Sequence, residues 1–268
     1  MTKLKVTIIG NSHAATLKKA LTQNPALNDE FDITFFVVGG LLHYNFYLDP
    51  DLTFRLPEDF AVTQDENRYL SGLNGSDRID LRNSENVFYI GRDFGEIEAA
   101  ELSLGYDVDQ IALGGRQQRL SKLAFEGYCK ELAHSFLPPG RWLQPLPFHL
   151  TVATAPYPGS SLAKTDDFHP GARRWKPVVD DPRNMKSISK AYEACLSTIL
   201  DAYGIAFLPQ PESTFDANGL TLPEFVRDKT EMHPNAGSLD DFRHMNAEFG
   251  LRTLNAYFES LKPRTRAE

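Results

Sequence analysis

The chain has 268 residues, of which 41% are hydrophobic and 24% are charged. A chain this apolar can bury a core that offsets its ordering entropy, so extended disorder is excluded. Acidic residues number 36 against 28 Lys and Arg, and the net charge of -8 argues against nucleic acid and anionic membranes as main partners. No apolar run in the sequence approaches the length that a bilayer requires.

The start of the chain and its cysteines suggest a compartment. Lys3 and Lys5 precede an apolar run, 6–9, that is too short for the core of a signal peptide. Cys129 and Cys195 form neither a disulfide framework nor a zinc motif. The sequence also lacks the glycine patterns of dinucleotide sites and P-loops, and its seven histidines form no ligand pair. We therefore expect a reduced, cytoplasmic protein without cofactor or metal.

The predicted strands are continuous apolar runs, which are typical of strands buried on both faces of a parallel sheet. In chain order they are 4–9, 32–38, 86–90, 147–153 and 205–208. Between and after them, apolar residues recur at helical spacing. The three predicted buried faces are Leu120, Leu123, Ala124, Tyr128 and Leu132; Ile188, Ala191, Tyr192, Cys195 and Ile199; and Leu251, Leu254, Phe258 and Leu261. This alternation predicts an α/β fold, a three-layer, doubly wound, flavodoxin-like parallel sheet of about five strands.

Two long segments interrupt this alternation. Residues 41–85 are polar, aromatic and rich in turn formers, and 156–186 hold five prolines and several charges. Loops of this length in a compact domain are usually functional or mobile. With no repeat and no clear boundary, 1–268 is predicted to form one domain with these two loop insertions.

A candidate nucleophile follows the first predicted strand, in the sequence Gly10-Asn11-Ser12-His13. The carboxyl end of a strand is the usual ligand edge of an open α/β sheet. A helix N-terminus beside Ser12 would favour the negative charge that develops when a serine attacks a carbonyl. The alternative is that Ser12 only caps the helix that follows.

A candidate base lies near the other end of the chain. In Asp241-Phe242-Arg243-His244, the aspartate precedes the histidine by three residues. An aspartate so placed can orient the imidazole, and the imidazole can then take a proton from a distant serine. The alternative is an ordinary helix start, in which Asp240 or Asp241 is the cap and His244 is solvated.

Taken together, the Gly-x-Ser after the first strand and the Asp-x-x-His before the last helix resemble the SGNH (GDSL-type) hydrolase family. The resemblance extends from Gly10 to Gly250, and 246–250 resemble the family's last block. It implies an SGNH-type fold with Ser12 as nucleophile and Asp241 and His244 as the other members of a catalytic triad.

A rival histidine stands in Met232-His233-Pro234-Asn235, which also resembles a family ending. The residue three positions before His233 is Thr230, and Asp228 stands at the wrong offset. Because a triad histidine needs an orienting acid, His244 is preferred.

The family's oxyanion donors are less well matched. Gly39 or Gly40 could supply a backbone N–H beside that of Ser12. After the third strand, Gly91-Arg92-Asp93 places an aspartate where the resemblance implies an asparagine. An ionised carboxylate cannot donate a hydrogen bond. Either Arg92 is the donor, Asp93 has another role such as a strand-end turn, or the site has diverged.

The sequence therefore predicts a serine esterase that removes a small acyl group, with acetyl esters of carbohydrates suggested by the family. Transfer of the acyl group to a sugar, and non-catalytic carbohydrate binding, remain the alternatives. The other candidate substrate-binding residues are Asn11, His13, Asp93 and His233. Aromatic residues in or near the long loops could stack on sugars or form local core, namely Tyr44, Tyr47, Trp142, Tyr157 and Trp175.

Overall fold

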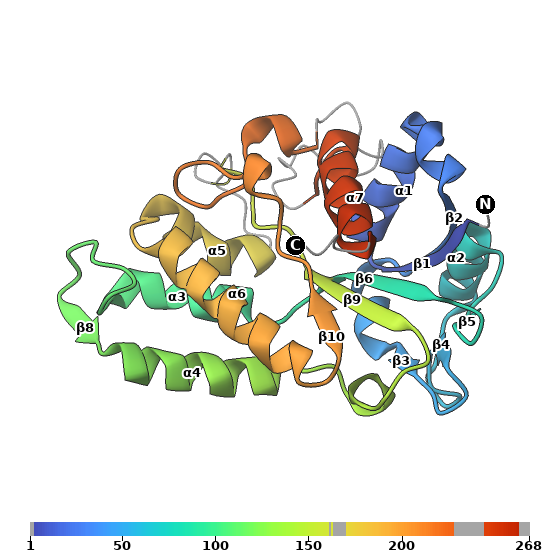
Figure 1. Ribbon diagram of the computed structural model, residues 1–268, viewed down its shortest axis with the longest axis horizontal. Coiled ribbons are helices and arrows are strands. Elements are labelled where there is room, and N and C mark those ends of the chain that lie inside the picture. Colours follow the sequence, from blue (N-terminus) through green and yellow to red (C-terminus); the bar gives the residue numbers. More distant parts are fainter. Residues whose placement is uncertain (1–2, 161, 163–169, 228–243, 263–268) are drawn as a thin grey trace, which may run out of the picture.

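The computed structural model describes residues 3–160, 162, 170–227 and 244–262. Its centre is a five-stranded parallel sheet in the order β10-β9-β6-β1-β2 (Figure 1). The strands are β1 Leu4–Gly10, β2 Phe31–Val37, β6 Asn86–Arg92, β9 His149–Thr154 and β10 Ile205–Phe207. The ends of each strand differ from the predicted runs by at most two residues. The predicted flavodoxin-like α/β fold is confirmed.

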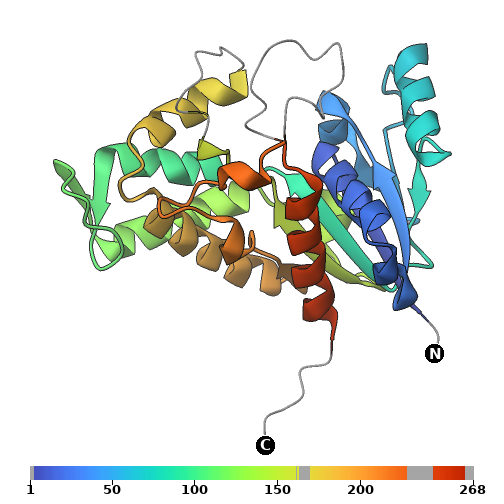
Figure 2. The same cartoon turned by 90° about the horizontal axis from the view of Figure 1, so that it is seen from above.

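Helices cover both faces of the sheet (Figures 1 and 2). The helices are α1 Ser12–Gln23, α2 Gln64–Asn74, α3 Glu96–Gly105, α4 Lys122–Ser135, α5 Pro170–Asp180, α6 Met185–Asp201 and α7 Ala247–Leu261. On one face α1 packs against α7, while on the other α6 contacts both α3 and α4. The described ranges contain no helix with the length and apolarity needed to cross a membrane.

Strand β6 divides the core between these two faces. Val87 and Tyr89 belong to the cluster that includes residues of α3, α4 and α6, whereas Phe88 and Ile90 belong to the cluster with α1 and α7. Successive residues of a strand point to opposite faces, so both sides of β6 are buried. This explains why its sequence is continuously apolar.

The predicted buried face of α4 was wrong at Leu123, Ala124 and Tyr128, whereas Leu132 and Leu120, which precedes the helix, are half-buried against the core. Leu123 is 79% exposed and Tyr128 is also exposed, whereas Phe125, Cys129 and Ala133 are buried. The prediction followed the largest apolar side chains. The helix instead turns the face with two small residues toward the core, where helix axes can approach closely.

The two predicted loop insertions contain regular structure. Within 41–85, β3 (Tyr47–Leu48), β4 (Thr53–Arg55) and β5 (Ile79–Asp80) form an antiparallel sheet, and α2 follows β4. The side chain of Asn74 bonds both the N–H and the C=O of Val37 at 2.8 Å, which covers the free edge of β2. Within 156–186, α5 packs against α3.

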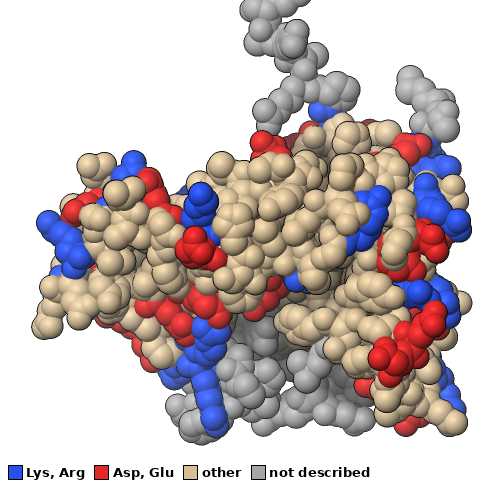
Figure 3. Space-filling view, turned by 90° about the horizontal axis from the view of Figure 1, so that it is seen from below, with Lys and Arg blue, Asp and Glu red and all other residues tan. Residues whose placement is uncertain are grey.

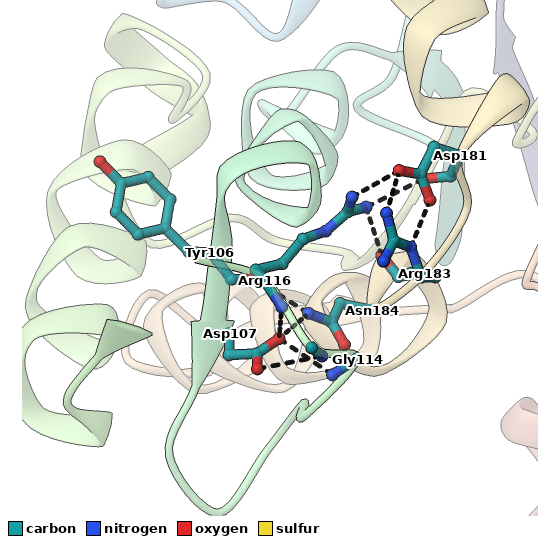
Figure 4. A network of polar contacts seen from close by, with 8 residues as sticks. Tyr106, Asp107, Gly114, Arg116, Asp181, Arg183 and Asn184 are labelled. Carbon is teal, nitrogen blue, oxygen red and sulfur yellow. Dashed lines mark hydrogen bonds and ion pairs between the residues drawn. The ribbon is translucent and has the colours of Figure 1, made fainter. Parts of the chain in front are cut away.

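A polar network fastens the segment between α3 and α4 to the start of α6 (Figure 4). The Asp107 carboxylate accepts hydrogen bonds from the backbone N–H groups of residues 114–116 and from Asn184 Nδ2, at 2.8–3.1 Å. Arg116 and Arg183 both pair with Asp181. These contacts hold the short strands β7 (Tyr106–Val108) and β8 (Gln118–Leu120) in place.

Charged side chains on the face in Figure 3 are interspersed, and Lys and Arg do not gather there in one patch. This face therefore offers no concentrated positive field to a polyanion. The expected absence of nucleic-acid and membrane partners stays a prediction.

Candidate active site

The turn from β1 to α1 is tightly constrained at the carboxyl edge of the sheet. A Cβ at Gly10 would overlap the Ile90 carbonyl oxygen of β6, so only glycine permits this approach. Asn11 caps α1 by accepting a hydrogen bond from the His13 N–H at 3.0 Å, and its Nδ2 donates to the Gly91 carbonyl at 2.7 Å. Asn11 thus joins the ends of β1 and β6.

Ser12 is the first residue of α1. The alternative in which Ser12 is merely the helix cap is wrong, because Asn11 takes that role. Ser12 therefore stands at a helix N-terminus with its hydroxyl available for another partner. That partner is His244, whose Nε2 lies 2.9 Å from Ser12 Oγ.

Backbone contacts on both sides hold His244 beside Ser12. The His244 carbonyl accepts from the Arg227 N–H at 2.9 Å, and Val226 forms a β-bridge with Met245. The N-cap of α7 is Asn246, whose Oδ1 accepts from the Phe249 N–H at 3.1 Å. The alternative in which Asp240 or Asp241 caps this helix and His244 is solvated is therefore wrong.

The packing of α1 on α7 fixes the distance between the two site residues. Thr16 Oγ1 donates to the Met245 carbonyl at 3.2 Å, one residue beyond His244. A Cβ at Gly250 would lie 2.8 Å from the Thr16 carbonyl oxygen, so glycine allows the two helices to approach here. The sequence analysis did not identify Thr16.

His13, a predicted substrate-binding residue, is 6% exposed and its ring lies 5.9 Å from the ring of His244. A buried ring in this position supports the His244 side chain. Asn11, also predicted to bind substrate, uses its side-chain oxygen and nitrogen to join the strand ends. Direct contact of either residue with substrate stays a prediction.

The predicted oxyanion glycines lie beside the end of β1. The Val38 N–H donates to the Gly10 carbonyl at 2.8 Å and so holds the chain after β2 against this edge. Gly39 precedes the 3₁₀-helix η2 (Gly40–Asn45) and lies under the ring of Tyr69. Their N–H groups as oxyanion donors stay a prediction.

Asp93 lies between the end of β6 and the start of α3. Its Oδ1 accepts from the Gly95 N–H at 2.9 Å, which forms a turn at the end of β6. Next to it, burial raises the pKa of Glu96 well above its ordinary value, and the charge of Asp93 raises it further. Of the predicted alternatives for Asp93, the geometry matches a structural role at the strand end.

His43 is a site residue that the sequence analysis missed. It belongs to η2, is 1% exposed, and its ring lies 5.4 Å from the ring of Tyr89 in a perpendicular arrangement. Burial, together with the positive charge of Arg92, lowers the pKa of His43 to about 4, so the ring is neutral at pH 7. No sequence motif marks this residue, because its surroundings combine η2 with the distant strand β6.

Two predicted site residues, Asp241 and His233, lie outside the described residues.

Of the loop aromatics, Trp142 and Tyr157 are buried and belong to the core, Tyr47 and Trp175 are half-buried, and Tyr44 is 55% exposed. In the part of the chain that the structure describes, no three His, Cys, Asp or Glu side chains are grouped as a metal site would require.

Comparisons with known proteins give little further support. No family model matches the chain, and no curated protein matches it. Among solved structures, the chain is similar to the periplasmic domain of a lipopolysaccharide acetyltransferase from Salmonella ser. Paratyphi A. The identity is 12% and the TM-score 0.41, over 97% of this chain and 84% of that chain. A similarity this low carries no functional inference, so function must be inferred from the site.

Proposed function

We propose that the protein is an acyl-group enzyme of the serine type that hydrolyses a small ester. The observation that carries this proposal is the 2.9 Å contact between Ser12 Oγ and His244 Nε2. A serine that touches an imidazole at a helix N-terminus has both a base for its proton and a positive potential for the developing negative charge. The acetylated-carbohydrate substrate follows from the family resemblance alone.

In the proposed reaction, Ser12 Oγ bonds to the ester carbonyl carbon while its proton passes to His244 Nε2. The carbonyl electron pair moves to the oxygen, which accepts hydrogen bonds from the Ser12 N–H and from Gly39 or Gly40. The imidazolium then protonates the leaving alcohol, and water releases the acyl group by the reverse sequence. Asp241 orients His244 in this scheme.

The test is hydrolysis of a small aryl acetate by the wild type and by Ser12→Ala and His244→Ala. Exposed Ser187 and His134, changed to alanine, are the matched controls. We expect activity in the wild type and both controls and none above background in the two site variants. Equal activity in all five proteins would contradict the proposal. Adding a sugar acceptor and analysing the products distinguishes hydrolysis from acyl transfer.

A further inference from the structure

A second group of polar side chains lies at the same edge of the sheet and consists of His43, Tyr89 and Arg92. His43 and Tyr89 are each 1% exposed, and Arg92 is half-buried with its guanidinium carbon 6.0 Å from the centre of the Phe94 ring. Arg92 acts on both other members through its charge. Its charge contributes to the low pKa of His43 and opposes the burial that raises the pKa of Tyr89.

The sheet order places this cluster beside Ser12. Strand β1 lies between β6, which ends at Arg92, and β2, which leads to His43. The charge of Arg92 therefore acts on His43 across the carboxyl end of β1, where the chain turns into Ser12. Gly91, next to Arg92, accepts the 2.7 Å hydrogen bond from Asn11, next to Ser12. Tyr89 packs on the face of the sheet that α3, α4 and α6 cover, whereas α1, which begins with Ser12, covers the other face.

Several nitrogens of the cluster are buried without a hydrogen-bond partner among the described residues. They are Nδ1 and Nε2 of His43 and Nε of Arg92. Each such group costs about 1–3 kcal/mol, so an arrangement that leaves three together requires an explanation. Unpartnered donors beside a nucleophile are explained if they donate hydrogen bonds to a negative charge that appears only during the reaction.

We propose that Arg92 is a catalytic residue that stabilises the oxyanion formed when Ser12 attacks, and that His43 is the positioning residue for its guanidinium. This inference rests on the proposed function. As the Ser12 Oγ–carbon bond forms and the proton moves to His244, an Arg92 N–H donates a hydrogen bond to the carbonyl oxygen. Arg92 gains and loses no proton. It replaces the donor that Asp93 cannot supply.

The neutral state of His43 is part of this arrangement. An imidazolium facing Arg92 would repel the guanidinium, whereas a neutral ring offers one acceptor nitrogen and one donor. Among the described residues, the Tyr89 and Tyr44 rings also face His43, both nearly perpendicular to it. The neutral His43 ring can therefore position the Arg92 guanidinium, and it carries no charge that would compete with the oxyanion for that guanidinium.

The test measures how fast a p-nitrophenyl phosphonate labels Ser12, since its tetrahedral adduct places an oxygen where the oxyanion forms. Nitrophenolate release gives the rate, and mass spectrometry of the peptide gives the site. We expect Arg92→Gln to label Ser12 about 10²-fold more slowly, the usual effect of losing one oxyanion donor. Arg92→Ala should recover at least about tenfold of its lost rate when guanidinium ion is added, since the ion restores the missing donor.

His43→Phe keeps a ring but removes both nitrogens, and we expect kcat for an aryl acetate to fall about tenfold with KM unchanged, a partial loss of a transition-state interaction. His43→Gln should restore part of that loss. Exposed Arg119→Gln is the matched control and should label at the wild-type rate. If Arg92→Gln labels Ser12 within threefold of the wild-type rate, roughly 0.7 kcal/mol, this inference is wrong although the proposed function stands. If the folded wild type is not labelled at Ser12, the proposed function fails.

Discussion

Two polar clusters of this protein satisfy their hydrogen bonds in opposite ways. Around Asp107, the carboxylate accepts four hydrogen bonds, three from consecutive backbone N–H groups and one from Asn184 (Figure 4). Around Arg92, three buried nitrogens have no partner among the described residues. Of the network in Figure 4, Arg116 Nε is also buried without a partner in the described part of the chain, so the contrast concerns the Asp107 carboxylate. A fully bonded carboxylate fixes the fold, whereas unpartnered nitrogens keep hydrogen-bonding capacity for another molecule.

The clusters also differ in how the chain builds them. The Asp107 carboxylate accepts hydrogen bonds from residues 114–116, which follow it closely in the sequence. Among the described residues, Asn184 is its distant partner. The cluster at the sheet edge combines a residue after β2 with two from β6. Only the completed sheet brings these segments together, so its geometry depends on the whole fold.

The largest expected effect separates the sheet edge that holds Ser12 from the Asp107 cluster by activity. Ser12→Ala and His244→Ala should each lower kcat by about 10⁴-fold or more, because serine and base act as one unit. His233→Ala should keep most of the activity, and Asn184→Gly should keep all of it. Steady-state kinetics on an aryl acetate checks this. A larger loss in His233→Ala than in His244→Ala would mean that His233 is the base.

The next effect concerns the pH dependence of stability. The pKa of His43 is lowered from 6.5 to about 4 in the fold. As the pH falls from 6.5 to 4, the unfolded chain takes up a proton that the folded chain does not, so stability is lost over this window. Relative to His43→Phe, the wild type should lose about 3 kcal/mol between pH 7 and pH 4.

Urea unfolding at several pH values measures that difference, in which all other titrating groups cancel. Parallel curves for the two proteins would show that His43 titrates normally and is not held neutral.

Asp107 and Asp181 affect stability at lower pH than His43 does. Their pKa values are depressed by hydrogen bonds from Asn184 and from Arg183 and Arg116, so their contribution is present above about pH 4 and lost below it.

A smaller effect is expected at Asn184, which bonds the fully hydrogen-bonded Asp107 carboxylate. Asn184 has a φ of 68°, which glycine adopts freely, so Asn184→Gly removes only the side-chain bonds to Tyr106 and Asp107. We expect the free energy of unfolding to fall by about 1–2 kcal/mol. Urea titration combined with kinetics checks this, and a tenfold fall in kcat at full stability would connect the network to the site.

The smallest effect is predicted for Asp93→Asn. An asparagine keeps the oxygen that accepts from the Gly95 N–H, so the turn before α3 is retained. The rate on an aryl acetate should change by less than about twofold, as for a residue remote from the transition state. A clear rise would instead mean that the amide donates to the oxyanion, and that Arg92 does not fill this role alone.

Sequence patterns predicted the parts of this protein that local chemistry determines. The five strands are visible because each contains a short run rich in apolar residues, and Ser12 and His244 stand out because their neighbours match a known spacing. The buried face of α4 was not predicted, since Cys129 and Ala133 carry a weaker apolar signal than exposed Leu123. The influence of Arg92 on His43 was not predictable, because it depends on the order in which β2, β1 and β6 lie in the sheet.

The central claim is that Ser12 is an activated nucleophile. The most direct measurement exposes the folded protein to an organophosphonate and locates the adduct by peptide mass spectrometry. We predict one adduct, on the peptide that contains Ser12, and a rate at least about 10³-fold lower in His244→Ala, since the base must take the serine proton. An adduct on another serine, or an unlabelled protein that is fully folded, would contradict the claim.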